Sequence, residues 1–483
     1  IDEIVALAKK RGADAIHPGY GFLSENEEFA KACEKNGIIF IGPPSEVLGR
    51  MGDKLSAKEL AERCQVPTIP GSTEPLKDSE DAIARANSYG YPVILKAAAG
   101  GGGRGMRACY NDKEVEQAFA LVTEEARKSF GNPAIFMEKF LVEPKHIEVQ
   151  ILADSHGNVV HLYERDCSLQ RRYQKVIEYT PAFSVPENVL EKLREEAVKI
   201  AREVGYVSAG TVEFLVDKDN NHYFIEMNPR IQVEHTVTEV ATGIDLVRAQ
   251  ILTAQGEPLS HPLIGINSQE DVTTRGFALQ CRVTTEDPEN NFAPDTGKIT
   301  AYRSGGGYGI RLDGGNVYTG AVISPYYDSL LVKITTYDST FEGVVLKARR
   351  ALTEMRVRGV KTNIAFLGKI LQNETFIQGK CHTKFIDETP ELFQLDDSKD
   401  RANKILKYIG NIVVNDPTAG AKMYDTPRFV PLENKEPKPG LKQLLDQKGP
   451  EAVKKWVLEQ KKLLITDTTM RVCNPVYIKP EPG

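Results

Sequence analysis

Apolar residues recur with two different spacings along the chain, and the spacing predicts which segments are strands and which are helices. The runs at 13–19 (ADAIHPG) and 38–43 (IIFIGP) are short and apolar, and each ends at glycine and proline, as buried parallel strands often do. A helix is predicted between them, over roughly 26–35. This stretch therefore predicts the second half of a βαβ-type layer. Because the chain opens with isoleucine inside a predicted helix, we expect a fragment whose first half-layer is absent.

The next hundred residues predict a helical connector and a small α+β region. The connector covers 44–67. A helix is then expected to begin near Asp112, a good N-cap residue, and to keep helical apolar spacing. The other elements expected here are a helix at 81–90 and strands at 91–97, 106–110 and 135–141.

Strands dominate from His146 onward. Two hairpins are predicted, one across the turn at 154–158 and one across the turn at 217–221. An amphipathic helix is predicted over 187–204, ended by Gly205. Further helices are expected near 244–254 and 341–355, and NKEPKPG at 434–440 is typical of a linker.

Composition narrows the class of protein. A length of 483 residues suggests about three domains. With 41% apolar residues, 27% charged residues and a net charge of −6, the chain is typical of a globular protein and not of a nucleic-acid binder. The seven cysteines include no C-x-x-C pair, so neither a zinc site nor a disulfide framework is expected. No apolar run approaches the ~20 residues of a membrane span.

A glycine run, AAAGGGGRGM, lies between two predicted strands. Glycine lets backbone N–H groups approach an anion closely. The run contains G-x-G-x-x-G, but a strand and not a helix follows, and no G-K-[ST] is present, so neither a Rossmann motif nor a P-loop is indicated. The alternative is a flexible surface turn. Lys96 before the run and Arg104 within it favour a flap that closes over a triphosphate.

The second predicted hairpin concentrates polar residues. Residues two apart on a strand share a face, so His222, Phe224, Glu226 and Asn228 are expected to point one way, with Glu213 opposite on the partner strand. Two carboxylates and an amide oxygen suit Mg²⁺.

Arg230, Gln232 and Glu234 continue the same spacing beyond Asn228. An acid, an amide and a guanidinium next to a metal would suit anion binding with a general base. The alternative is a polar strand face with salt-bridged pairs. The short cationic segment QRRYQK at 170–175 is relevant only if the fold brings it to this hairpin.

These motifs together resemble biotin carboxylases of the ATP-grasp superfamily. The resemblance runs from residue 1 to about 390. Segments such as QCRVTTEDPENNFAPDTGKI (280–299) are similar to the pyruvate carboxylase branch, and LLITDTTMR (463–471) resembles the first barrel strand of its carboxyltransferase domain. Further motifs that support it are HPGYGFLSEN (17–26), MGDK (51–54), MEKFL (137–141), FIEMNPRIQVEHTVTE (224–239), SPYYDSLLVK (324–333) and GIRLDGG (309–315).

The resemblance implies a role for each matching position. ATP would contact Lys54, Lys96, Gly101, Gly102, Gly103, Glu138, Lys139, Leu141, His146, Gln170 and the position of Tyr173, where the family generally has histidine. Mg²⁺ or Mn²⁺ would be held by Glu213, Glu226 and Asn228. Bicarbonate would be bound by Lys175, Arg230, Gln232 and Val233, with Glu234 as its base, and Arg311 would stabilise the biotin enolate.

The implied fold is an ATP-grasp α/β and α+β assembly, with 1–43 as the remnant of an N-terminal α/β domain, 44–67 as connector, 68–141 as a glycine-rich lid and 142–390 as a large C-terminal domain. Residues 391–462 would be a linker and part of a tetramerisation region, and 463–483 would begin a carboxyltransferase domain and add an unassigned tail. Val472 stands where that domain has a metal-binding aspartate.

The implied activity is carboxylation of biotin by bicarbonate and ATP, the first half-reaction of pyruvate carboxylase. No A-M-K-M biotinylation motif is present, so biotin would come from a separate carrier domain. Expected partners are that carrier, a carboxyltransferase domain and further copies of the chain, but neither nucleic acid nor membrane, in the cytoplasm or, in an animal, the mitochondrial matrix. Alternatives are the biotin carboxylase of an acyl-CoA carboxylase, another ATP-grasp carboxylate ligase, or a non-enzymatic assembly module.

Overall fold

The computed structural model describes residues 1–52, 54–72, 74–97, 106–130, 133–315, 317–395, 405–406, 408–410 and 441–460. It divides into two units, Ile1–Asp397 and Ser398–Gly483. The glycines of the predicted flap, Gly101, Gly102 and Gly103, and the whole of 463–483 lie outside the described residues, as does the predicted linker at 434–440.

The N-terminal layer has the predicted βαβ-type order. Its two short strands are parallel, and the helix between them starts where the Asn26 side chain accepts a hydrogen bond from the N–H of Phe29. Such a cap contributes about 1 kcal/mol. The elements are α1 (Asp2–Arg11), β1 (Ala15–Ile16), α2 (Glu27–Lys35) and β2 (Ile39–Phe40).

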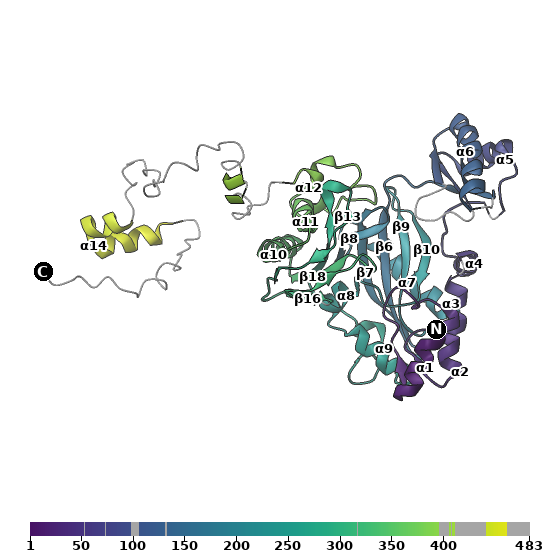
Figure 1. The fold of residues 1–483 in the computed structure, drawn as a ribbon, viewed down its shortest axis with the longest axis horizontal. Helices are drawn as coiled ribbons and strands as arrows, with labels where there is room; N and C mark the ends of the chain where they lie inside the picture. The colour runs from purple at the N-terminus through teal and green to yellow at the C-terminus, as the bar shows by residue number, and fades with distance from the viewer. Residues whose placement is uncertain are drawn as a thin grey trace. The chain divides into compact units, whose positions relative to one another are not determined.

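The connector is helical and the region after it is a small α+β unit, as predicted. Three antiparallel strands in the order β4-β3-β5 pack on two helices, visible together as α5 and α6 in Figure 1. The N-cap of α6 is Asn111 and not Asp112, because the Asn111 side chain accepts the N–H of Glu114. The elements are α3 (Ser45–Gly52), α4 (Lys54–Arg63), α5 (Ser79–Tyr89), β3 (Val93–Ala97), β4 (Met106–Cys109), α6 (Asp112–Phe130) and β5 (Ile135–Lys139).

The centre of the first unit is an eight-stranded antiparallel sheet in the order β10-β9-β6-β7-β8-β11-β18-β16. Both predicted hairpins are present in it. Strands β8 and β11 are neighbours although about one hundred residues separate them. The strands are β6 (Lys145–Ala153), β7 (Val159–Arg171), β8 (Gln174–Thr180), β9 (Ser208–Val216), β10 (His222–Asn228), β11 (Phe277–Thr284), β16 (Ile310–Gly314) and β18 (Leu330–Asp338).

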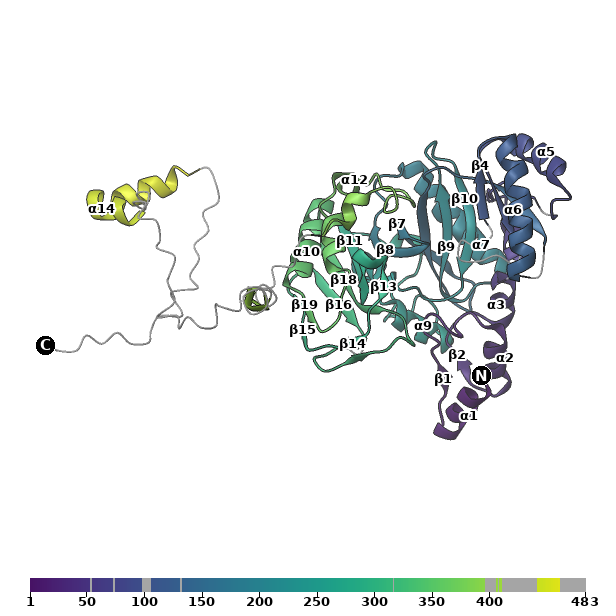
Figure 2. The same ribbon diagram turned by 45° about the horizontal axis from the view of Figure 1, so that its top comes forward.

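Helices bury the two faces of this sheet, as the two views in Figures 1 and 2 show. Helix α7 (Glu187–Val204) packs its apolar stripe on β6, β9 and β10 and ends at Gly205, whose φ of +68° suits glycine. Each fully buried large apolar side chain contributes about 1.5–3 kcal/mol. The remaining helices are α8 (His235–Thr242), α9 (Leu246–Ala254), α10 (Phe341–Glu354), α11 (Ile364–Ile370) and α12 (Glu374–Ile377).

Short elements complete the first unit. Three two-stranded pairs join β12 (Glu286–Asp287) to β13 (Ala293–Pro294), β14 (Gly297–Lys298) to β17 (Val322–Ile323), and β15 (Ala301–Arg303) to β19 (Arg356–Arg358). Single 3₁₀ turns span Gln269–Asp271, Pro288–Asn290 and Pro390–Phe393.

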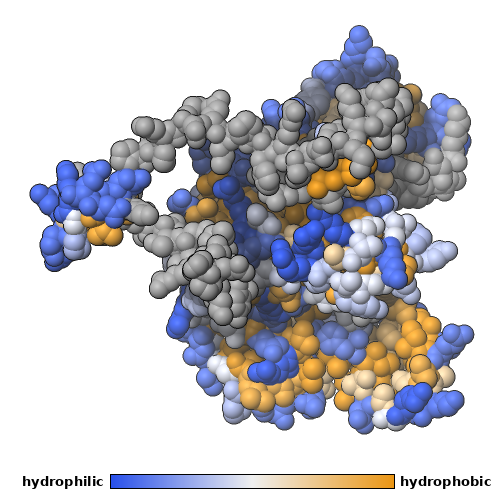
Figure 3. All heavy atoms as spheres, turned by 60° about the vertical axis from the view of Figure 1, so that its left-hand side comes forward, coloured by the Kyte–Doolittle hydropathy of each residue, from blue (hydrophilic) through white to orange (hydrophobic). Residues whose placement is uncertain are grey.

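The described part of the second unit consists mainly of α14 (Leu441–Leu458). This helix is kinked at Gly449, the residue before Pro450. Among the described helices, none combines the length and the hydropathy needed to cross a membrane. Figure 3 shows hydrophilic and hydrophobic areas interspersed on the face that it presents.

Candidate functional site

Polar side chains share one face of three neighbouring strands. On β6, Ile147 and Val149 enter the apolar core under α7, so Glu148 between them faces the other way. Glu148 is the cross-strand partner of Glu213 on β9, and Glu213 is the partner of Glu226 on β10. Three carboxylates therefore form one row across the sheet. The prediction that Glu213 and Glu226 face each other across the hairpin is confirmed.

The prediction that His222 and Phe224 share the face of Glu226 and Asn228 is wrong. The register skips one residue between Phe224 and Glu226, which is a β-bulge. Phe224 and Met227 both enter the core under α7, three residues apart. The extra residue reverses the alternation, so only the part of β10 after the bulge presents its polar residues to the carboxylate row.

The strand also ends earlier than predicted. β10 stops at Asn228, and Glu234 is the N-cap position of α8, so Arg230, Gln232 and Glu234 lie in a turn and not on a strand. The turn nevertheless brings two of them to the carboxylate row. Gln232 Nε2 donates to Glu213 Oε1 at 2.9 Å, and Glu234 contacts Lys175.

Lys175 lies at the centre of the site. Its Nζ donates to Glu148, to Glu213 Oε1 at 2.9 Å and to Glu234 Oε1 at 2.7 Å. Burial alone would lower the pKa of this ammonium group, but the three carboxylates outweigh burial and raise the pKa well above its usual value. Lys175 therefore stays charged and joins the hairpin, the turn and β6. The fold does return the end of the cationic segment to the hairpin.

Glu213 is surrounded by donors. Besides Lys175 and Gln232, Asn228 Nδ2 donates to Glu213 Oε1 at 2.9 Å, and His146 Nε2 lies 2.8 Å from Glu213 Oε2. Burial would raise the pKa of Glu213, but Lys175 and the neighbouring His146 hold this pKa well below its ordinary value. Glu213 is therefore an ionised, buried carboxylate.

Glu234 is held by two cations. Lys175 binds its Oε1, and Nη2 of Arg282 on β11 binds its Oε2 at 2.8 Å. Burial raises the pKa of Glu234, yet Lys175, Arg282 and Arg165 together hold it below the ordinary value. The structure therefore adds Arg282 to the site, a residue that the sequence did not predict.

A second arginine that the sequence did not predict, Arg165, lies beneath the site. Arg165 on β7 is fully buried and donates to Glu148, and Nη2 donates to Gln232 Oε1 at 2.8 Å. Its Nη1 also donates to Gln150 Oε1 at 2.6 Å. The alternation of His146, Glu148 and Gln150 with apolar residues was a visible signal for the β6 members.

Arg230 points toward the N-terminal layer. Its Nη2 donates to Asn228 Oδ1 at 3.1 Å, and its Nε lies 3.3 Å from Glu25 Oε2. The carbonyl of Val233 accepts Lys333 Nζ at 3.0 Å. Arg230 and Val233 thus lie on the same turn as Gln232, beside the carboxylate row.

The predicted nucleotide contacts divide into two groups. His146 and Gln170 lie together, with Gln170 Nε2 2.6 Å from His146 Nδ1, next to Glu213. In the small α+β unit, Lys96 on β3 pairs with Glu138 on β5. Lys139 Nζ donates to the carbonyls of Gly90 and Tyr91, and burial lowers its pKa. Leu141 follows β5.

Two predicted residues, Lys54 and Tyr173, and Arg171 of the cationic segment are not placed at the site. The backbone of Lys54 begins α4, but its side chain lies outside the described atoms. Tyr173 lies in the turn between β7 and β8 with φ +66° and is 71% exposed. The neighbouring Arg171 turns away from the carboxylates and donates to Asn291 Oδ1 at 2.6 Å.

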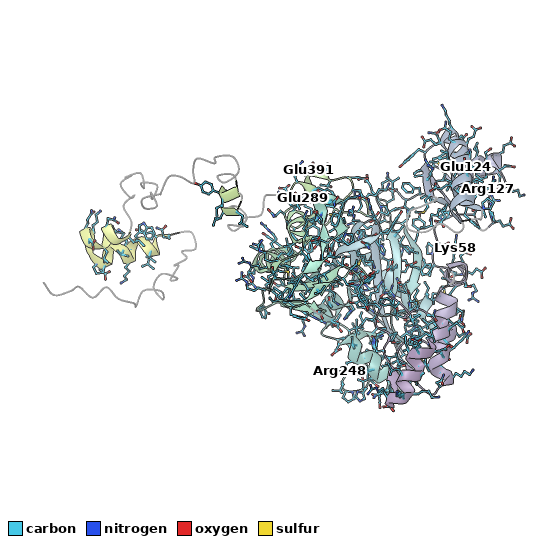
Figure 4. All side chains as sticks on the ribbon, in the orientation of Figure 1. Lys58, Glu124, Arg127, Arg248, Glu289 and Glu391 are labelled. Carbon is cyan, nitrogen blue, oxygen red and sulfur yellow. The ribbon has the colours of Figure 1, made fainter. Side chains whose placement is uncertain are left out.

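Arg311 lies on β16, where it pairs with Glu239 at 2.6 Å and with Asp313 at 2.8 Å. It lines an open hollow of about 720 Å³ beside α9. Arg248, labelled in Figure 4, lines the same hollow. The Arg311 guanidinium is therefore accessible through this hollow, from outside the carboxylate row.

The residues fit a hard divalent cation. Mg²⁺ prefers carboxylate and amide oxygens, and Glu213, Glu226 and Asn228 provide them from one face of two paired strands. Ligand atoms of His146, Glu148 and Glu213 also lie within 4.8 Å of one another. Because Glu213 is ionised, it is in the form that binds metal.

Three family models match the chain in order. Residues 1–48 match the biotin carboxylase N-terminal domain, residues 53–262 match the ATP-binding domain of the carbamoyl-phosphate synthase L chain, and residues 280–388 match the biotin carboxylase C-terminal domain.

Curated relatives match nearly the whole chain. This chain is 53% identical to pyruvate carboxylase of Bacillus subtilis over 98% of the chain, and 52% identical to that of Aspergillus terreus over 97% of the chain. These matches cover 41% and 40% of the two relatives, so the chain spans about two fifths of their length.

Solved structures of biotin carboxylases and of a pyruvate carboxylase are also similar to this chain. The biotin carboxylase domain of Hydrogenobacter thermophilus 2-oxoglutarate carboxylase, a dimer with MgADP and bicarbonate, is 47% identical with a TM-score of 0.75, over 82% of this chain and 86% of that one. The biotin carboxylase subunit of a pyruvate carboxylase is 48% identical with a TM-score of 0.72 and the same coverage. Rhizobium etli pyruvate carboxylase is 49% identical with a TM-score of 0.77, over 97% of this chain and 42% of that one.

Proposed function

The chain belongs to the biotin carboxylase family of ATP-grasp ligases, and on that premise we propose that it carboxylates biotin with ATP and bicarbonate, as the first half-reaction of a pyruvate carboxylase. The observation that best supports this is the position of Lys175, whose ammonium group contacts both the proposed metal ligand Glu213 and the proposed base Glu234. One ammonium group thus links the places where phosphate and bicarbonate would meet.

Bicarbonate would bind among Lys175, Arg230, Gln232 and Val233. Phosphoryl transfer depends mainly on positioning and charge neutralisation, which two cations on one small anion provide. When Lys175 moves from Glu234 to bicarbonate, Glu234 loses one of the cations that lower its pKa and becomes a better proton acceptor.

The proton step then has a defined direction. Glu234 takes the hydroxyl proton, and the bicarbonate oxygen attacks the γ-phosphorus of ATP as ADP leaves. The product is carboxyphosphate, whose bond between the carboxyl carbon and the bridging oxygen breaks to give CO₂ and phosphate next to biotin. Glu213, Glu226 and Asn228 would hold Mg²⁺ or Mn²⁺, which neutralises the phosphate charge when bound.

ATP would bind between the sheet and the small α+β unit. His146 and Gln170 would border the ribose, and Lys54 and the flap glycines would contact phosphates. Lys96 now pairs with Glu138. Nucleotide binding would exchange this ion pair for a contact of Lys96 with phosphate and of Glu138 with adenine. Lys139 and Leu141 would border adenine as well, whereas the exposure of Tyr173 leaves its contact dependent on closure of the nucleotide site.

Biotin would approach at Arg311. The open hollow beside this guanidinium gives a covalently carried ring a route from outside. Stabilising the biotin enolate requires Arg311 to leave Glu239 or Asp313, its present partners.

We propose a separate biotinyl carrier domain, a carboxyltransferase domain for pyruvate, and self-association of the chain as partners, with a cytoplasmic or, in an animal, mitochondrial-matrix location.

Replacing the proposed base tests the proposal. In Glu234→Gln we expect biotin-dependent ADP release to fall at least about a hundredfold, because general-base catalysis contributes that much. The Kd for MgATP, measured by calorimetry, should stay within about threefold, since nucleotide binding does not use Glu234. Glu191→Gln, a change at an exposed position of α7, is the matched control. Full turnover in Glu234→Gln would show that another group is the base.

A further inference from the structure

Arg282 lies between two buried carboxylates. Its Nε donates to Glu178 Oε1, and its Nη2 donates to Glu234 Oε2 at 2.8 Å. The Glu178 side chain is fully buried and that of Glu234 is 3% exposed. A guanidinium group presents several donors in one rigid plane, so it can hold two carboxylates in a fixed relative orientation.

Glu178 is itself fixed. Its Oε2 accepts Gln280 Nε2 at 2.9 Å, and Gln280 is its cross-strand partner on β11. The backbone of Arg282 is held as well, because its carbonyl accepts Asn363 Nδ2 at 2.8 Å. Arg282 therefore has a rigid support on the side away from Glu234.

The two oxygens of Glu234 have different partners. Oε1 is bound by Lys175, whose ammonium group also donates to Glu148 and Glu213. Oε2 is bound by Arg282, which is anchored by Glu178. If substrate drew Lys175 away, Oε1 would be released while Oε2 stayed bound.

We propose that Arg282 is a positioning residue for the reaction: anchored on Glu178, it holds Oε2 of Glu234 so that Oε1 faces bicarbonate and takes its proton. The inference rests on the proposed function. In this step the O–H bond of bicarbonate breaks, a new O–H bond forms at Oε1, and the electron pair stays on the bicarbonate oxygen that attacks phosphorus.

The same bonds would also serve a purely structural pair, so the test compares two buried pairs. Arg194 on α7 binds the fully buried Glu164 at 2.8 Å, away from the carboxylate row. Arg194→Met removes a guanidinium from that pair, as Arg282→Met does in the site. Both should lower thermal stability, but only Arg282→Met should change catalysis.

The experiment measures bicarbonate- and biotin-dependent ADP release on the full-length protein that contains this chain. In Arg282→Met we expect kcat to fall at least about tenfold, part of the general-base contribution, while the Kd for MgATP stays within about twofold. Arg282→Lys should regain stability but not the full kcat, because an ammonium group cannot hold both carboxylates in one plane. Arg194→Met should keep the wild-type kcat.

A double variant identifies the route of the effect. If Arg282 acts through Glu234, adding Arg282→Met to Glu234→Gln should change the residual single-turnover rate by less than about twofold. An equal loss in both backgrounds, or full kcat in Arg282→Met, would overturn the inference. If Arg282→Met does not fold, Glu178→Gln takes its place, and an unchanged kcat there has the same meaning. Absence of bicarbonate-dependent turnover in the wild-type protein would instead contradict the proposed function, and the inference with it.

Discussion

Replacement of Lys175 by methionine should expose how much of the site depends on one ammonium group. The side chain is 12% exposed and contacts three carboxylates that are 0–7% exposed. Methionine has a similar length but no charge. The variant therefore leaves buried negative charge without its main counter-charge, and we expect a loss of both turnover and stability.

The size of the stability loss follows from the burial. Removing one partner of a buried ion pair costs about 3–5 kcal/mol. For a unit of 397 residues, an unfolding entropy of about 2.1 cal/mol/K per residue gives about 0.8 kcal/mol per degree. The melting temperature should therefore fall by about 4–6 °C.

The pH dependence should change direction. In the wild type the pKa of Glu213 is lowered in the folded state, so its stabilisation is present above its unfolded value of about 4.5 and is lost only as the pH falls below it. Without Lys175 we expect burial to outweigh the remaining effect of His146, so that the folded pKa of Glu213 rises above the unfolded value. A carboxyl group with a raised folded pKa destabilises the folded state as the pH rises above the unfolded pKa. The melting temperature of the variant should therefore fall between about pH 5 and pH 8.

Thermal melts of wild type and Lys175→Met across this pH range provide the measurement. Lys347→Met is the matched control, because Lys347 pairs with a single, partly exposed carboxylate, Asp338, and a pair of that kind contributes at most about 1 kcal/mol. If Lys175→Met and the wild type give parallel curves, Lys175 does not neutralise the cluster and the electrostatic account of the site is wrong.

Two further outcomes concern the metal and biotin. Asn228→Ala should raise the Kd for Mn²⁺ by at least about tenfold, because the loss of a group from a metal site usually has an effect of this size. The Kd is measured by electron paramagnetic resonance in the presence of ATP, with calorimetry in the absence of metal as the control for nucleotide binding. An unchanged Kd would remove Asn228 from the ligand set. Arg311→Met should lower the biotin-dependent rate at least about tenfold while leaving biotin-independent ATP hydrolysis within about twofold, and parallel losses in both rates would contradict a role confined to biotin.

Much of the fold was predictable because it depends on local patterns. The hairpin turns, the amphipathic stripe of α7 and the stop at Gly205 are properties of short segments, and each is present. The end of β10 and the helix α8 were not predictable in this way, since EMNPRIQVEH alternates polar and apolar residues like a strand. The turn is favoured by contacts of Gln232 and Glu234 with distant strands.

The site was predictable in part. Glu213, Asn228, Gln232 and Glu234 converge as the sequence and the resemblance suggested. Arg282 was missed because its partner Glu178 lies on a strand about one hundred residues away, and one sequence does not reveal that β8 and β11 are neighbours. A buried arginine and a surface arginine look alike in a strand pattern.

The β-bulge in β10 has a consequence for anyone who transplants the β9–β10 hairpin onto another scaffold. An idealised hairpin that kept Ile225 but paired it as an ordinary strand residue would have a regular two-residue repeat. Aligned on Phe224 in the core, such a graft would bury Glu226 among apolar side chains and turn Met227 outward. A metal-binding graft must therefore copy the irregularity as faithfully as it copies the ligands.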